Sequence, residues 1–150
     1  MDNWEVETLN ISGIVDDSIV DGPGLRYTIF VQGCPHGCPE CHNPQTHSFE
    51  ENKRVTLGQL MSEIKENPLL YGVTFSGGEP FCQPGPLAIL GQQIKKAGMH
   101  LMCYSGYTYE QLLKRAETEP DVTALLNVVD VLVDGPFLIV ERDLELLYRG

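Results

Sequence analysis

Three cysteines lie within eight residues of one another, and Cys34, Cys38 and Cys41 follow the pattern CxxxCxxC. Thiolates this close together can bind one metal centre, and the prolines and the glycine between them keep the backbone out of a helix. A four-iron cluster usually takes four cysteine ligands, so three thiolates leave one iron open to another ligand. The spacing therefore favours a 4Fe-4S cluster with one open iron.

A zinc site is the alternative use of the same thiolates. His36 or His42 would then supply the fourth ligand beside the three cysteines. Structural zinc sites more often combine two separated pairs of ligands, whereas Cys82 and Cys103 stand alone in this sequence. The spacing by itself leaves zinc open as a second interpretation.

Composition and charge limit the class of protein. A chain of 150 residues predicts one domain, spanning residues 1–150. Ten Lys and Arg against 21 Asp and Glu give a net charge of -11, which argues against a nucleic acid or an anionic membrane as the main partner. The polar, acidic N-terminus and the absence of a long apolar run predict a cytoplasmic protein, where clustered thiols indicate a metal or catalysis.

Strands and helices alternate along the chain. The pattern predicts strands over residues 26–31, 72–75, 99–104 and 128–133, and helices over 57–66, 86–97, 109–117 and 121–127. Short strands that are each followed by a helix favour a parallel sheet with right-handed crossovers. The expected fold class is α/β.

Unusual segments follow four of the predicted strands, at residues 33–42, 76–80, 105–106 and 134–137. Ligands of parallel α/β sheets bind beyond the carboxyl ends of the strands, so these segments predict one shared site. Asp134 and Arg26 are candidates for shaping that site or a partner-binding surface. Asp134 has an equally good interpretation as a turn residue.

The cysteine motif after the first of these strands and Gly77-Gly78-Glu79-Pro80 after the next resemble the radical S-adenosylmethionine superfamily. The resemblance implies a partial (β/α) barrel of mostly parallel strands. It also implies that Cys34, Cys38 and Cys41 ligate a 4Fe-4S cluster whose fourth iron is chelated by the amino and carboxylate groups of S-adenosylmethionine. The segment with Gly77, Gly78 and Glu79 would contact the amino group of the methionine moiety.

One branch of the superfamily is similar over most of the chain, through the strings at residues 18–26, 33–44, 105–108 and 131–137. It comprises the activating enzymes of anaerobic ribonucleoside-triphosphate reductase. The resemblance implies reductive cleavage of S-adenosylmethionine to a 5'-deoxyadenosyl radical, which generates a glycyl radical on the reductase. It also implies a low-potential electron donor such as flavodoxin.

Two alternatives to that function stay open. Activation of pyruvate formate-lyase or of another glycyl-radical enzyme is the nearer one, because related enzymes share the cysteine string. A non-catalytic zinc or iron-sulfur carrier is the alternative of another class, although a carrier has no use for the glycine-rich segment at a second strand end.

The sequence departs from its relatives at three places. Glu40 stands where many members of the superfamily have an aromatic residue against the adenine, so only backbone contacts from Glu40, Cys41 and His42 are expected there. His47 stands where a tryptophan is common. The branch usually continues beyond Gly150, so the single domain is expected to be truncated at its C-terminus.

Overall fold

The computed structural model describes residues 3–19, 22–33, 53–134, 138–141 and 146–149. The strands are β1 (Thr8–Ser18), β2 (Arg26–Val31), β3 (Lys53–Thr56), β4 (Gly72–Gly77), β5 (His100–Tyr104), β6 (Val131–Asp134), β7 (Leu138–Glu141) and β8 (Leu146–Arg149). The α-helices are α1 (Leu57–Glu66), α2 (Pro84–Lys96), α3 (Tyr109–Ala116) and α4 (Pro120–Val128). Two short 3-10 helices, η1 (Trp4–Val6) and η3 (Pro80–Cys82), complete the described elements.

The described strands form one sheet in the order β3-β1-β2-β4-β5-β6-β7-β8. Strands β2, β4, β5 and β6 are parallel neighbours in the centre. The flanking pairs β1/β2, β1/β3, β6/β7 and β7/β8 are antiparallel, so β3 and β8 run in the same direction as the central four strands. The expectation of an α/β fold with mostly parallel strands is therefore confirmed.

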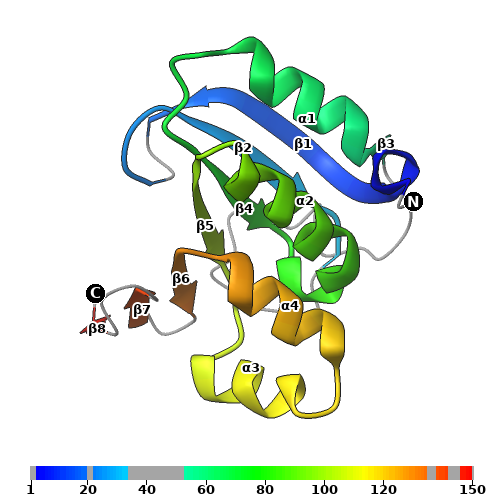
Figure 1. The fold of residues 1–150 in the computed structure, drawn as a ribbon. Helices are drawn as coiled ribbons and strands as arrows, with labels where there is room; N and C mark the ends of the chain where they lie inside the picture. Colours follow the sequence, from blue (N-terminus) through cyan, green and yellow to red (C-terminus); the bar gives the residue numbers. More distant parts are fainter. Residues whose placement is uncertain (1–2, 20–21, 34–52, 135–137, 142–145, 150) are drawn as a thin grey trace.

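Helices α1, α2 and α4 cover one face of this sheet (Figure 1). The central strands follow one another in the sheet in the same order as in the chain, and right-handed crossovers then place every connecting helix on the same side. The strand residues Ile29 and Phe75 and the helix residues Leu60 and Leu90 are fully buried in the resulting core. Helix α3 lies at the end of the layer, against α4.

Helix α1 shows why the sequence folds as it does locally. Leu57, Leu60, Met61 and Ile64 are buried, and their spacing places them on one face of the helix. The hydroxyl of Thr56 accepts a hydrogen bond from the backbone N–H of Gln59 at 3.2 Å, which caps the helix N-terminus. The predicted limits of 57–66 are confirmed, as are those of the strand over 26–31.

Most of the other predicted limits differ by one or two residues, and the largest difference is at β6. The strand expected over 128–133 begins only at Val131, because α4 continues through Val128. A Cβ added to Gly91 of α2 would lie 2.6 Å from Cγ2 of Val128, so Val128 packs tightly against the neighbouring helix. This contact favours the helical conformation over the local preference of a valine-rich segment for a strand. Among the described residues, no helix is long and apolar enough to cross a membrane.

Candidate functional site

The carboxyl ends of the four central strands lie side by side. Pairing of β2 with β4 places Val31 opposite Gly77, and pairing of β5 with β6 places Tyr104 opposite Val133. Since β4 and β5 are also parallel neighbours, the segments that follow all four strands leave the same edge of the sheet. The expectation that these strand ends share one edge is confirmed for the described residues.

The glycine-rich segment after β4 is bonded directly to the end of β2. The N–H of Gly78 donates to the carbonyl of Val31 at 2.8 Å, and the N–H of Glu79 donates to the carbonyl of Gly33 at 2.6 Å. Gly33 is the residue before Cys34, so Glu79 is tied to the start of the cysteine motif.

Gly77 permits this close approach. Its φ is +94°, and a Cβ added there would lie 2.6 Å from the backbone nitrogen of Val31. Such contacts are shorter than real Cβ atoms show, and the atom in the way belongs to the backbone of a central strand. Only glycine fits at Gly77 without moving β2 away from β4.

The carboxylate of Glu79 is fully buried and joins β4 to the end of β5. One oxygen accepts from the hydroxyl of Ser105 at 2.8 Å and from the N–H of Phe81 at 3.0 Å. The other oxygen accepts from the N–H of Gly106 at 2.7 Å. A buried carboxylate is stable only with such donors, so the turn after β5 and the glycine-rich segment are positioned together.

Asp134, at the end of β6, is 3% exposed and binds the start of a helix at the same edge of the sheet. Its carboxylate accepts from the N–H of Tyr109, the first residue of α3, at 2.6 Å. Thr108 and Gln111 form a capping box at the same helix end. These contacts make Asp134 a residue that fixes the start of α3, a role that neither interpretation included, and both interpretations stay predictions.

Arg26 is not part of this edge. It is the first residue of β2, at the opposite end of the strand, and its side chain is fully buried. The guanidinium donates to the hydroxyl of Thr74 at 2.6 Å and to the carbonyls of Pro23 and Val73, both at 2.8 Å. Arg26 therefore does not line the carboxyl edge of the sheet, and these bonds hold Pro23 and β4 against the start of β2, while its role at a partner-binding surface stays a prediction.

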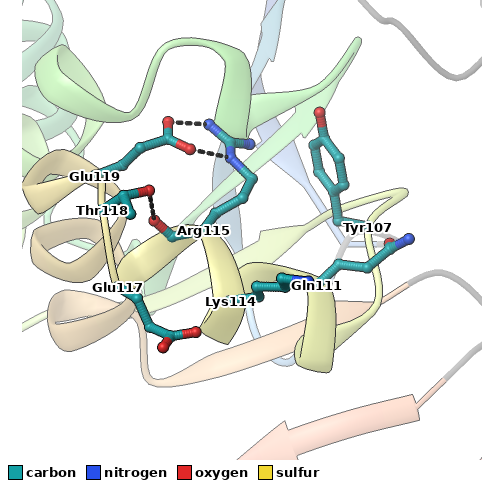
Figure 2. Close-up of a pocket in the computed structure, with 7 residues that line it drawn as sticks. All are labelled: Tyr107, Gln111, Lys114, Arg115, Glu117, Thr118 and Glu119. Atoms are coloured by element: carbon teal, nitrogen blue, oxygen red, sulfur yellow. Dashed lines mark hydrogen bonds and ion pairs between the residues drawn. The ribbon is translucent and has the colours of Figure 1, made fainter.

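A cavity of about 590 Å³ lies beside the turn after β5 (Figure 2). The Arg115 guanidinium lies over the ring of Tyr107, 5.1 Å from its centroid, and binds Glu119 through two hydrogen bonds of 2.9 and 2.8 Å. Burial raises the pKa of the Tyr107 hydroxyl, and nearby Cys82 raises it further while Arg115 opposes the shift. Tyr107 therefore stays protonated as an aromatic wall of this cavity.

The two isolated cysteines differ in exposure. Cys103 is fully buried in β5, and burial raises the pKa of its thiol well above the ordinary value, with the charge of Glu79 adding to the shift. A thiol held in its protonated form is a poor metal ligand. Cys82 is half-buried in η3 and lines a second cavity, of about 420 Å³.

Several predicted site residues lie outside the described ranges. These are Cys34, Cys38, Glu40, Cys41 and His42, together with the alternative zinc ligand His36. Their ligand roles therefore stay predictions. Of the predicted site, the structure describes Gly77, Gly78 and Glu79.

Sequence reasoning missed the side chain of Gln83, which binds the backbone of Asn10 in β1 and of Gln32, the residue after β2. It also missed the Arg115–Glu119 pair beside Tyr107. No spacing rule marks Gln83. The separation of four residues between Arg115, near the end of α3, and Glu119, just beyond it, is a signal that could have been used.

Comparison with known proteins defines the class. Residues 20–150 match the family described as a 4Fe-4S single cluster domain. The anaerobic ribonucleoside-triphosphate reductase-activating protein of Vibrio cholerae serotype O1 is 33% identical over 141 residues, which cover 88% of this chain and 86% of the relative. The pyruvate formate-lyase-activating enzyme of Clostridium pasteurianum is 34% identical over 134 residues, which cover 83% of this chain and 54% of the relative.

A solved structure also aligns with part of the fold. The crystal structure of QueE from Escherichia coli has a TM-score of 0.49 and 20% sequence identity, and the alignment covers 67% of this chain and 53% of that chain.

The described part of the chain is an α/β fold with a shared strand-end edge, and the chain belongs to the 4Fe-4S single cluster domain family. Within that family it is a radical S-adenosylmethionine enzyme of the activating class, as the resemblance at Gly77-Gly78-Glu79 implied. A 4Fe-4S cluster is therefore its cofactor.

The described residues fit a small amino-acid ligand beside such a cluster. The N–H groups of Gly78 and Glu79 and the carboxylate of Glu79 are already bonded within the protein. The carbonyl of Gly78 accepts no hydrogen bond from any other described residue. A strand-end carbonyl with no donor among the described residues is a suitable acceptor for an amino group.

Proposed function

We propose that Cys34, Cys38 and Cys41 ligate the 4Fe-4S cluster and that S-adenosylmethionine occupies its remaining iron. The three thiols begin one residue after Gly33, whose carbonyl is bonded to Glu79. This bond supports the proposal, because it ties the start of the cysteine loop to the glycine-rich segment expected to hold the methionine moiety. A zinc site would not need that second segment.

The proposed contacts to S-adenosylmethionine divide into two groups. Glu40, Cys41 and His42 would contact it through their backbone, and Gly77, Gly78 and Glu79 would form the opposite side. The carbonyl of Gly78 is the proposed acceptor for the amino group. Glu79 contributes by holding this segment in place, since its carboxylate is already bonded to the end of β5.

When bound at these residues, the cluster and S-adenosylmethionine would supply one-electron chemistry. An electron from a low-potential donor such as flavodoxin would reduce the sulfonium, and cleavage of a carbon–sulfur bond would give methionine and a 5'-deoxyadenosyl radical. The protein's residues orient the cofactor and exclude water from the site. The buried Glu79 and Ser105 keep two neighbouring strand ends fixed during that chemistry. No side chain has to move a proton.

The proposed partner is the glycyl-radical subunit of anaerobic ribonucleoside-triphosphate reductase. The observation that carries this choice is the extent of the match, which covers 86% of the Vibrio cholerae reductase-activating protein but only 54% of the Clostridium pasteurianum relative. Pyruvate formate-lyase is the second candidate, supported by the similar identity of 34% to its activating enzyme.

The test is direct transfer of the radical. The reconstituted protein is incubated without oxygen with S-adenosylmethionine, a reductant, and either the anaerobic reductase or pyruvate formate-lyase. Electron paramagnetic resonance then identifies which partner acquires a glycyl radical. A signal on the reductase supports the proposal, and a signal on pyruvate formate-lyase alone would refute the choice of partner.

A further inference from the structure

The last three residues before Cys34 are tethered through three consecutive carbonyl oxygens. Val31 accepts from the N–H of Gly78 at 2.8 Å, and Gly33 accepts from the N–H of Glu79 at 2.6 Å. The middle carbonyl, of Gln32, accepts from Nε2 of Gln83 at 3.2 Å. All three donors belong to the short segment that connects β4 to α2, so this segment fixes where the chain leaves β2.

Gln83 also binds β1 in the manner of a neighbouring strand. Its Oε1 accepts from the N–H of Asn10 at 2.9 Å, and its Nε2 donates to the carbonyl of Asn10 at 2.8 Å. The same carbonyl accepts from the N–H of Gln32 at 3.1 Å. The one amide group therefore joins β1, β2 and the start of α2.

The three tethers differ in what they require of the sequence. The donors of Gly78 and Glu79 are backbone N–H groups, which nearly any residue supplies. The middle donor is a side chain, and it must present an acceptor and a donor at the same time to satisfy both groups of Asn10. A neutral carboxamide does this with separate donor and acceptor atoms on one planar group, and Gln has the length observed here.

We propose that Gln83 is a positioning residue for the iron-sulfur cluster. By holding Asn10 and Gln32, it sets the direction in which the backbone enters the cysteine loop, two residues before Cys34. This inference rests on the proposed ligation of the cluster by Cys34, Cys38 and Cys41. Gln83 touches neither the cluster nor the substrate in this proposal and acts only through the backbone of Asn10 and of Gln32, the residue after β2.

Two substitutions test the role, with a matched control. Gln83→Met keeps the length of the side chain and removes its hydrogen bonds. Gln83→Glu keeps the acceptor for Asn10 but places an oxygen opposite the carbonyls of Asn10 and Gln32. Gln92→Glu makes the same change at an exposed position of α2.

The readout is the rate at which each reconstituted protein loses iron to a chelator, measured well below the unfolding temperature of its cluster-free form. We expect iron loss to be roughly tenfold faster in both Gln83 variants, the effect of about one net hydrogen bond, and unchanged in Gln92→Glu. The electron paramagnetic resonance spectrum of the reduced cluster should also respond differently to added S-adenosylmethionine in the Gln83 variants. A residue that merely stabilises the fold would change the unfolding temperature and neither of these properties.

Two outcomes would be negative, and they are distinguishable. Wild-type rates and spectra in both folded Gln83 variants would overturn the positioning role while leaving cluster ligation intact. If Cys38→Ala instead retains the full iron content of the wild type, the proposed ligation fails, and the inference about Gln83 fails with it.

Discussion

Replacement of Gly77 by alanine should have two separate costs, the strain of a positive φ and the collision of an added Cβ with β2. Gly77 has a φ of +94°, and an added Cβ would meet three backbone atoms of β2 at 2.6 to 2.7 Å. Gly98, which follows α2, has a similar φ of +79° but no atom within 4 Å of an added Cβ. Gly98→Ala is therefore a matched control that carries the backbone strain without the collision.

The two substitutions should lower the free energy of unfolding by different amounts. The positive φ costs roughly 1–2 kcal/mol for an L-residue at either position. At Gly77 the collision adds an overpacking cost of about 1–3 kcal/mol, because the atoms in the way belong to a central strand and cannot rotate aside. We expect Gly98→Ala to lower the free energy of unfolding by about 1 kcal/mol and Gly77→Ala by about 3 kcal/mol.

Urea unfolding of the cluster-free proteins, followed by circular dichroism, measures both values. Gly77→Ala should also impair reconstitution of the cluster, since it moves β4 away from the strand that leads into Cys34. Equal destabilisation by the two substitutions would refute the close approach of β4 to β2. The role assigned to Gly77 would then be lost.

Three further predictions follow from the described contacts. Ser105→Ala removes a hydroxyl donor from the buried carboxylate of Glu79 and should lower the free energy of unfolding by about 1.5–3 kcal/mol. Urea titration measures this value, and a wild-type result would contradict the hydrogen-bonded bridge between β4 and β5. The hydrogen bond to Arg115 lowers the pKa of Glu119 in the folded protein. The stabilisation from this pair is therefore present above the unfolded-state pKa of Glu119 and is lost as the pH falls through its lower folded-state pKa. Thermal unfolding measured across the acid range should therefore be less pH-dependent in Glu119→Gln, and an unchanged profile would count against the pair. Burial raises the pKa of Tyr27 far above its usual range, so the free energy of unfolding falls as the pH rises past the unfolded-state pKa near 10. Tyr27→Phe should reduce this loss of stability at alkaline pH. The same alkaline pH dependence in the variant and the wild type would contradict it.

The elements that the sequence predicted well have strong local signals. Helix α1 has four buried apolar residues at helical spacing and a Thr56 cap, and β2 is a run of β-branched and aromatic residues. Strand β1 was not expected, because its second half includes Asp16 and Asp17, which are exposed, and pairs with β2. Strand β3 has only four residues, two of them charged, and also depends on pairing with β1.

The candidate site was predictable to a similar degree. Glycine-rich and polar segments after successive strands indicated a shared edge, and parallel pairing of the central strands confirms it. The bonds of the Glu79 carboxylate to Ser105 and Gly106 could not be predicted, because they depend on the register between β4 and β5. The displaced start of β6 likewise depends on the packing of Val128 against Gly91.

Cleavage of S-adenosylmethionine tests the central claim most directly. The reconstituted protein is incubated without oxygen with S-adenosylmethionine and a reductant, and 5'-deoxyadenosine is measured by chromatography. The account predicts that the wild-type protein releases 5'-deoxyadenosine and that Cys38→Ala releases none, while Cys82→Ala retains the activity. A protein that binds one zinc ion tightly and releases no 5'-deoxyadenosine would contradict it.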